Sequence, residues 1–150
     1  MNPDFALTES LIRRYYDAFN AGNWEGMLDC LADDVVHHLN QGAREVGKPA
    51  FEAFLDRMAR CYREQLKSIV VCVACDSTRA AAEYEVHGSY LADDEGLPPA
   101  TGQRYVLPGG AFFDVRDGRI ARVSNYYNLS DWIAQVSKTS ERVGRDGLPA

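Results

Sequence analysis

The sequence predicts an α+β domain in which three helices pack on a strongly curved antiparallel sheet and leave a cone-shaped hollow. Apolar residues recur at helical spacing as far as Tyr62, and from Ser68 onward they alternate with polar ones. Helices that come first along the chain and strands that follow are typical of domains with the helices on one face of a sheet. A sheet curved in this way is open at one end, where a small molecule can bind.

The first helix is expected to begin at Pro3, with Asn2 as its N-cap, because proline suits the first helical position. It ends at Asn20-Ala21-Gly22, where glycine can take the left-handed conformation that closes a helix. An apolar stripe with a period of four joins these ends and consists of Leu7, Leu11, Tyr15 and Phe19.

Two further helices and a short strand are expected before the sheet. Asn23 can cap the second helix, which ends at Asp33-Asp34, and residues 35–40 then have the pattern of a strand. The third helix begins at residues 47–49. One face of the second helix is expected to carry Trp24, Met27, Leu28 and Leu31, and one side of the third carries Phe51, Phe54, Leu55, Met58 and Tyr62.

Alternation then predicts four longer strands, at residues 68–75, 80–91, 103–115 and 119–128. Tight turns at residues 76–78 and 116–118 close two hairpins, and an acidic loop at residues 93–100 is expected to be solvated. In the strand 80–91, Tyr84 and Val86 should face the helices, whereas its glutamates and histidine should face outward. Residues 129–136 have helical spacing.

Length and composition define one globular domain. Its 150 residues are 46% hydrophobic and 25% charged, so we expect a single domain at residues 1–136 and a polar tail at 137–150. A net charge of −6 argues against a nucleic-acid partner. No apolar run approaches the roughly 18 residues of a membrane span, and no secretory signal is recognised, which favours a cytoplasmic location.

The four cysteines do not predict a metal or redox site. Cys72 and Cys75 have CxxC spacing, but within a strand residues three apart point to opposite faces, so their thiols cannot converge. A zinc site also needs a second pair of ligands. We therefore expect buried or half-buried free thiols, and no metal.

Four stretches, in order along the chain, carry a resemblance to a known superfamily. They are RYYDAFNAG at 14–22, LADDVV at 31–36, GKPAFEAF at 47–54, and DGRI continuing to NL at 117–129. Over about residues 5–136 the chain resembles the nuclear transport factor 2-like superfamily, in the branch of ketosteroid isomerases and SnoaL-like polyketide cyclases. The resemblance implies the cone-shaped, cystatin-like α+β fold, cofactor-independent chemistry, and a homodimer packed through the convex sheet face.

The resemblance also implies a partial set of isomerase groups. Ketosteroid isomerases use a carboxylate base, together with a tyrosine and a protonated aspartic acid that bind the enolate oxygen. The tyrosine position falls on Tyr15. The base position falls on Leu39 and the second acid on Gly109-Gly110, so neither carboxylate is retained.

The strand around Leu39 leaves two alternatives, because a shift of one residue turns every side chain to the other face. If Leu39 faces inward, His37 does too, and His38 and Asn40 face away. If a bulge changes the register, His38 and Asn40 line the pocket. A neutral imidazole could serve as general base near neutral pH.

SnoaL-like cyclases carry an acidic residue near the end of the last strand. Here that stretch holds Asn125 and Asn128, which cannot exchange a proton near neutrality although they can form hydrogen bonds. Alternation would point Val123, Asn125 and Tyr127 into the pocket.

These arguments give two hypotheses of function. The first is an isomerase, cyclase or lyase that transfers a proton on a hydrophobic carbonyl compound, with Tyr15, His38 and Asn40 as catalytic candidates. The second is a non-catalytic binding or accessory module with the same fold. An epoxide hydrolase would need an inward Asp–Arg pair, which the sequence does not reveal. The expected substrate-binding residues are Phe19, Phe54, Met58, Tyr84, Val86, Phe112, Asn125 and Tyr127.

Overall fold

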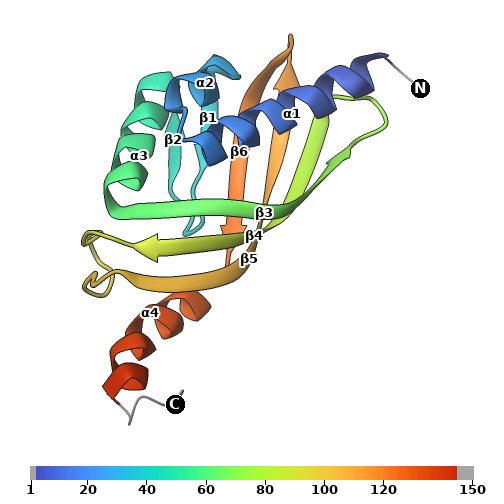
Figure 1. Cartoon of the computed structure of the whole chain (residues 1–150). Coiled ribbons are helices and arrows are strands. Elements are labelled where there is room, and N and C mark those ends of the chain that lie inside the picture. The colour runs from blue at the N-terminus through green and yellow to red at the C-terminus, as the bar shows by residue number, and fades with distance from the viewer. Residues whose placement is uncertain (1–2, 145–150) are drawn as a thin grey trace.

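The α+β prediction is confirmed by a computed structural model, which describes the backbone of residues 3–144 and the side chains of residues 4–138. Four helices accompany a curved sheet that does not close on itself. Figure 1 shows α1, α2 and α3 together on one side of this sheet, with α4 at the opposite end. The elements are α1 (Pro3–Ala21), α2 (Trp24–Asp29), β1 (Leu31–His38), β2 (Arg44–Val46), α3 (Lys48–Cys61), β3 (Tyr62–Val73), β4 (Arg79–Tyr90), β5 (Gln103–Arg116), β6 (Arg119–Tyr127) and α4 (Leu129–Gly144).

The six strands lie in the order β2-β1-β6-β5-β4-β3, and one pairing departs from the antiparallel prediction. Strands β3 to β6 form the expected meander, but β1 runs parallel to β6. Parallel neighbours need a long connection rather than a hairpin. The chain supplies one, because β2, α3 and strands β3 to β5 lie between the two strands.

The second helix is shorter than predicted. It ends at Asp29, and Leu31 already pairs with Ile120 in the sheet instead of lying on the helix. The backbone amide of Ile120 donates to the Cys30 carbonyl at 2.8 Å, so the sheet begins where the helical pattern predicted another turn. The short edge strand β2 was not predicted.

Asn20 connects the end of α1 to β3. Its Nδ2 donates to the Leu66 carbonyl at 2.9 Å, and its Oδ1 accepts from the Leu66 amide at 2.8 Å. The Asn20 side chain thus forms the pair of hydrogen bonds that a neighbouring strand would form. It does so next to a register shift between Lys67 and Val70. Gly22 follows with a φ of 69° and ends the helix as predicted. The two hydrogen bonds of Asn20 hold β3 against the C-terminal end of α1.

Strand faces follow alternation, with one error in the prediction. In β4, Tyr84 and Val86 face the helices, and the outward His87 Nε2 lies 2.6 Å from Glu85 Oε1. In β5, however, Phe113 is the inward residue, fully buried, and Phe112 is 50% exposed on the other face. The expected inward position of Phe112 is therefore wrong.

The cysteines are free, as expected, but only Cys30 and Cys61 are buried. Cys72 and Cys75 are exposed, because Cys72 lies on the outward face of β3 and Cys75 follows the strand at a turn.

Helix α4 continues past the predicted end at Val136. Residues 145–150 and the expected cap at Asn2 lie outside the described residues. Over the described residues, none of the helices combines the length and the apolar character that a membrane span requires.

Candidate functional site

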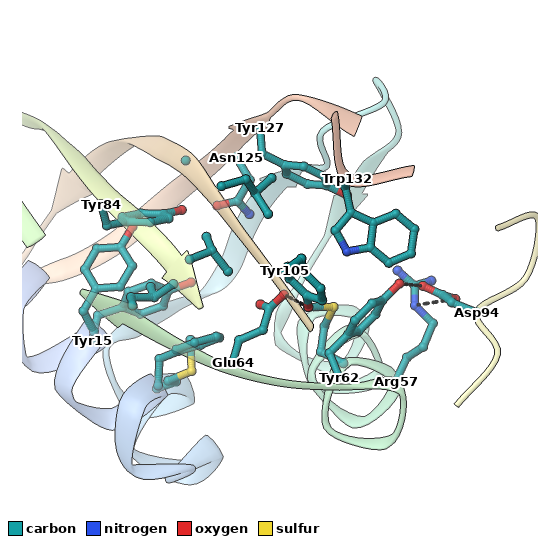
Figure 2. Close-up of a pocket in the computed structure, with 18 of the residues that line it drawn as sticks. Tyr15, Arg57, Tyr62, Glu64, Tyr84, Asp94, Tyr105, Asn125, Tyr127 and Trp132 are labelled. Atoms are coloured by element: carbon teal, nitrogen blue, oxygen red, sulfur yellow. Dashed lines mark hydrogen bonds and ion pairs between the residues drawn. The ribbon is translucent and has the colours of Figure 1, made fainter. Parts of the chain in front are cut away.

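A cavity of about 180 Å³ lies between α1, α3 and the concave face of the sheet, and Trp132 of α4 contributes to its far end. Figure 2 shows its tyrosines at both ends and a carboxylate, Glu64, between them. The lining consists of Tyr15, Tyr16, Phe19, Met27, Arg57, Met58, Tyr62, Glu64, Leu66, Tyr84, Val86, Asp94, Leu97, Tyr105, Leu107, Gly109, Asn125, Tyr127 and Trp132.

Most of the predicted lining is in place. Seven of the predicted residues line the cavity, because helical spacing on α1 and α3 and alternation on β4 and β6 turn one side of each element inward. They are Tyr15, Phe19, Met58, Tyr84, Val86, Asn125 and Tyr127.

The structure places the remaining candidates outside the lining. His38 faces away from the helices and its Nδ1 lies 3.0 Å from Ser124 Oγ. Asn40 follows β1, and its Oδ1 accepts from the Tyr127 amide at 2.9 Å. The expected pocket roles of His38 and Asn40 are corrected for this reason: the strand has the register in which His37 faces inward. Phe54, Phe112 and Val123 are also absent from the lining, since Phe54 packs on His37, Phe112 faces outward and Val123 is fully buried.

His37 lies directly behind the cavity wall. Its ring is 1% exposed and packs against Phe51 and Phe54 with centroid distances of 4.6 Å. Its Nε2 lies 2.9 Å from Nδ2 of Asn125, which is a lining residue. Burial, aided by the nearby charges of His38 and Arg57, lowers the pKa of His37 from 6.5 to about 4, so the ring is neutral at physiological pH.

Three tyrosines form one end of the cavity. Tyr15 and Tyr16 are adjacent on α1, with ring centroids 5.2 Å apart, and Tyr16 packs at 5.4 Å on Tyr84 of β4. Burial raises the pKa of Tyr15 well above its ordinary value and that of Tyr84 to about 12. Each phenol therefore keeps its proton and can donate it in a hydrogen bond.

Glu64 is the functional candidate that the sequence analysis missed. It lies on the inward face of β3 in the middle of the cavity, and the Tyr105 hydroxyl donates to its Oε2. Burial raises the pKa of Glu64, and the hydrogen bond from Tyr105 partly opposes this. The predicted strand began at Ser68, although alternation of inward residues at Tyr62 and Glu64 could have revealed the earlier start.

A glycine makes room for this contact. Gly88 on β4 pairs with Tyr105 on β5, and a Cβ at Gly88 would lie 2.4 Å from Cζ of the Tyr105 ring. Gly109 does the same for Tyr84, with 2.8 Å from an added Cβ to the ring. Both tyrosine rings therefore lie flat on the sheet because the neighbouring residue has no side chain.

A polar cluster forms the other end of the cavity. The Tyr62 hydroxyl donates to Asp94 Oδ2 at 2.7 Å, and Arg57 Nε lies 3.7 Å from Asp94 Oδ1. The Asp94 side chain is only 13% exposed, so the expectation of a fully solvated acidic loop is wrong at this residue. Arg57 and Asp94 are an Asp–Arg pair in the pocket lining that the sequence analysis missed, because α3 and a distant loop supply one residue each.

Within the described part of the chain, histidines, cysteines and carboxylates form no cluster of three or more suited to a metal ion. The chemistry that the lining itself can provide is acid–base and hydrogen-bonding chemistry. It has one carboxylate with a raised pKa, several protonated phenols and one amide.

A cone of this kind with a largely apolar pocket defines a class of small-molecule-binding α+β proteins. The model of the SnoaL-like domain matches residues 12–123, so the chain belongs to the SnoaL-like family. This membership confirms the predicted resemblance. A search of curated proteins found no match to the chain.

Solved structures support the same assignment. A proposed polyketide cyclase from Xanthomonas campestris pv. campestris is 60% identical, with a TM-score of 0.86 over 89% of this chain and 98% of its own. A proposed polyketide cyclase from Pseudomonas putida KT2440 is 58% identical, with a TM-score of 0.85 over 86% and 97% of the two chains. An LEH-like epoxide hydrolase from M. tuberculosis shares the fold, at 16% identity and a TM-score of 0.70 over 95% of this chain and 98% of its own.

Proposed function

We propose that this protein is a cofactor-independent enzyme that transfers a proton next to a carbonyl group of a hydrophobic small molecule, as an isomerase or a cyclase. The observation that carries the proposal is Glu64, a carboxylate with a raised pKa in the middle of an apolar, tyrosine-lined cavity. A general base is most effective when its pKa approaches the working pH, and burial moves Glu64 in that direction.

Glu64 would act as the general base, and Tyr15 would donate a hydrogen bond to the enolate. Tyr105 occupies Glu64 Oε2, so Oε1 is the oxygen that can take a proton from the carbon beside the carbonyl. The electrons of that C–H bond move onto the carbonyl oxygen, and the resulting enolate accepts a hydrogen bond from the Tyr15 phenol. Such a donor in a dry site stabilises the developing negative charge.

The proton then has two possible destinations. In an isomerase, the substrate carries a C=C bond conjugated with the enolate, and protonated Glu64 returns the proton to the far carbon of this dienolate. In a cyclase, the enolate carbon attacks a second carbonyl of the same molecule, a C–C bond forms, and the new alkoxide takes the proton from Glu64. The proposed cyclases among the similar structures favour the second route.

Exchange of hydrogen for deuterium in 2-tetralone tests the proposal, because it requires only proton abstraction, exchange of the abstracted proton with D₂O and return of a deuteron to the same carbon. In D₂O the wild-type protein should accelerate exchange at the carbon beside the carbonyl. Glu64→Gln should lose about a hundredfold or more of that acceleration. Glu83→Gln, on the exposed face of β4, is the matched control and should exchange at the wild-type rate.

Two results would contradict the proposal. The first is equal exchange in wild type and Glu64→Gln. The second is saturable binding of 2-tetralone without any acceleration of exchange, which would favour the non-catalytic binding module instead.

A further inference from the structure

The amide of Asn125 can present either its oxygen or its NH₂ group to the cavity, and its neighbours decide which. Asn125 pairs with Ala111, which in turn pairs with Ala82, so small side chains flank it across the sheet. Behind it, His37 Nε2 lies 2.9 Å from Asn125 Nδ2. In Figure 2 the amide lies on the same side of the cavity as Tyr84 and Tyr127.

His37 in turn faces a carboxylate. Glu45 of β2 pairs directly with His37, and its Oε1 lies 3.9 Å from His37 Nδ1. Both of these atoms are buried and neither has a hydrogen-bond partner at closer range. Phe51 and Phe54 cover the rest of the ring.

The carboxylate determines which ring nitrogen of His37 carries the proton. An ionised carboxylate can only accept hydrogen bonds, and a neutral imidazole has one N–H and one lone pair. A proton on Nδ1 points an N–H at Glu45, whereas a proton on Nε2 would point a lone pair at it. The first arrangement is favoured, and it leaves the lone pair on Nε2.

We propose that Glu45 and His37 act as positioning residues that turn the Asn125 carbonyl oxygen toward the cavity, so that this wall selects a ligand with a hydroxyl group there. The Nε2 lone pair accepts from the Asn125 NH₂ group, and Oδ1 is left to accept from the ligand. The inference rests on the proposed use of the cavity and narrows the ligand class to carbonyl compounds that also carry a hydroxyl.

The tautomer of His37 tests the first link without any ligand. Long-range ¹H–¹⁵N spectra at pH 7 should show a protonated Nδ1 and a bare Nε2. Glu45→Gln should weaken that preference, because its amide can also donate, while Glu52→Gln on the exposed side of α3 should leave it unchanged. A wild-type ring protonated on Nε2 would overturn the inference.

Two matched probes test the second link, namely 2-naphthol and its methyl ether, 2-methoxynaphthalene. By calorimetry, wild type should bind the naphthol roughly five- to tenfold more tightly, the value of about one hydrogen bond. Asn125→Leu should remove this preference, and Glu45→Gln should reduce it, with little change in affinity for the ether. Equal affinities in wild type, an unchanged ratio in Asn125→Leu, or no binding of either probe would refute the inference.

These outcomes are separable from those of the proton-transfer proposal. If the protein prefers the naphthol but does not accelerate exchange in 2-tetralone, the hydroxyl-selective wall is supported and the proton-transfer proposal is refuted. Exchange of 2-tetralone without a preference for the naphthol would support the proton-transfer proposal and refute the hydroxyl-selective wall.

Discussion

Acidification should destabilise the folded protein through His37. The unfolded chain binds a proton at this residue near its ordinary pKa of 6.5, whereas the folded chain does so only near about 4. Between these values the unfolded state holds more protons, so the free energy of unfolding falls as the pH falls. Each pH unit corresponds to about 1.4 kcal/mol, which gives a loss of about 3 kcal/mol by pH 4.

Urea denaturation of wild type and His37→Gln from pH 7 to pH 4 measures this loss. The variant has no titrating ring, so its stability should fall by about 3 kcal/mol less than that of wild type over this range. Leu7→Gln, at an exposed position of α1 without a titratable group, is the control and should follow wild type. The reasoning is refuted if the two variants have the same pH dependence, or if the difference between wild type and His37→Gln develops only below pH 4.

Three further predictions concern other parts of the molecule. Gly88→Ala should push Tyr105 away from Glu64 and raise the Glu64 pKa further, since the hydrogen bond from Tyr105 lowers this pKa. A ¹³C NMR titration of the Glu64 carboxyl group measures the change, and an unchanged titration would contradict the contact. Asn20→Ala should cost about 2 kcal/mol in urea denaturation, because two hydrogen bonds to the β3 backbone are lost; a cost near zero would show that they do not position the strand. Phe112→Asp should convert the expected homodimer to a monomer in sedimentation velocity; a wild-type chain that is already monomeric would contradict the expectation.

Much of the lining could be predicted because single elements carry clear patterns. The stripe on α1 and the alternation in β4 each allow only one inward side, and they place Tyr15 and Tyr84 correctly. Phe112 and Phe113 are adjacent, so the local pattern does not determine which ring points inward. The pairing of β5 with β6 determines that Phe113 points inward, because Phe113 pairs with Val123 and both are buried.

The missed residues depend on contacts between distant segments. Glu64 is an acidic residue between polar neighbours, which is typical of a solvated side chain, and its pairing with Gly88 on β4 places it on the cavity side of the sheet. Asp94 lies in an acidic loop that would usually be solvated, but its hydrogen bond from Tyr62 holds it at the cavity. His37 and His38 are alternatives until the partner strands of β1 are known.

The parallel pairing of β1 with β6 has a consequence for how the protein is made. Strand β1 is synthesised well before its neighbour on one side, residues 119–127, because α3 and four other strands of the sheet lie between them in the sequence. Long-range pairings of this kind slow folding. The wall that holds His37 and Asn125 is therefore completed only after β6 has been synthesised.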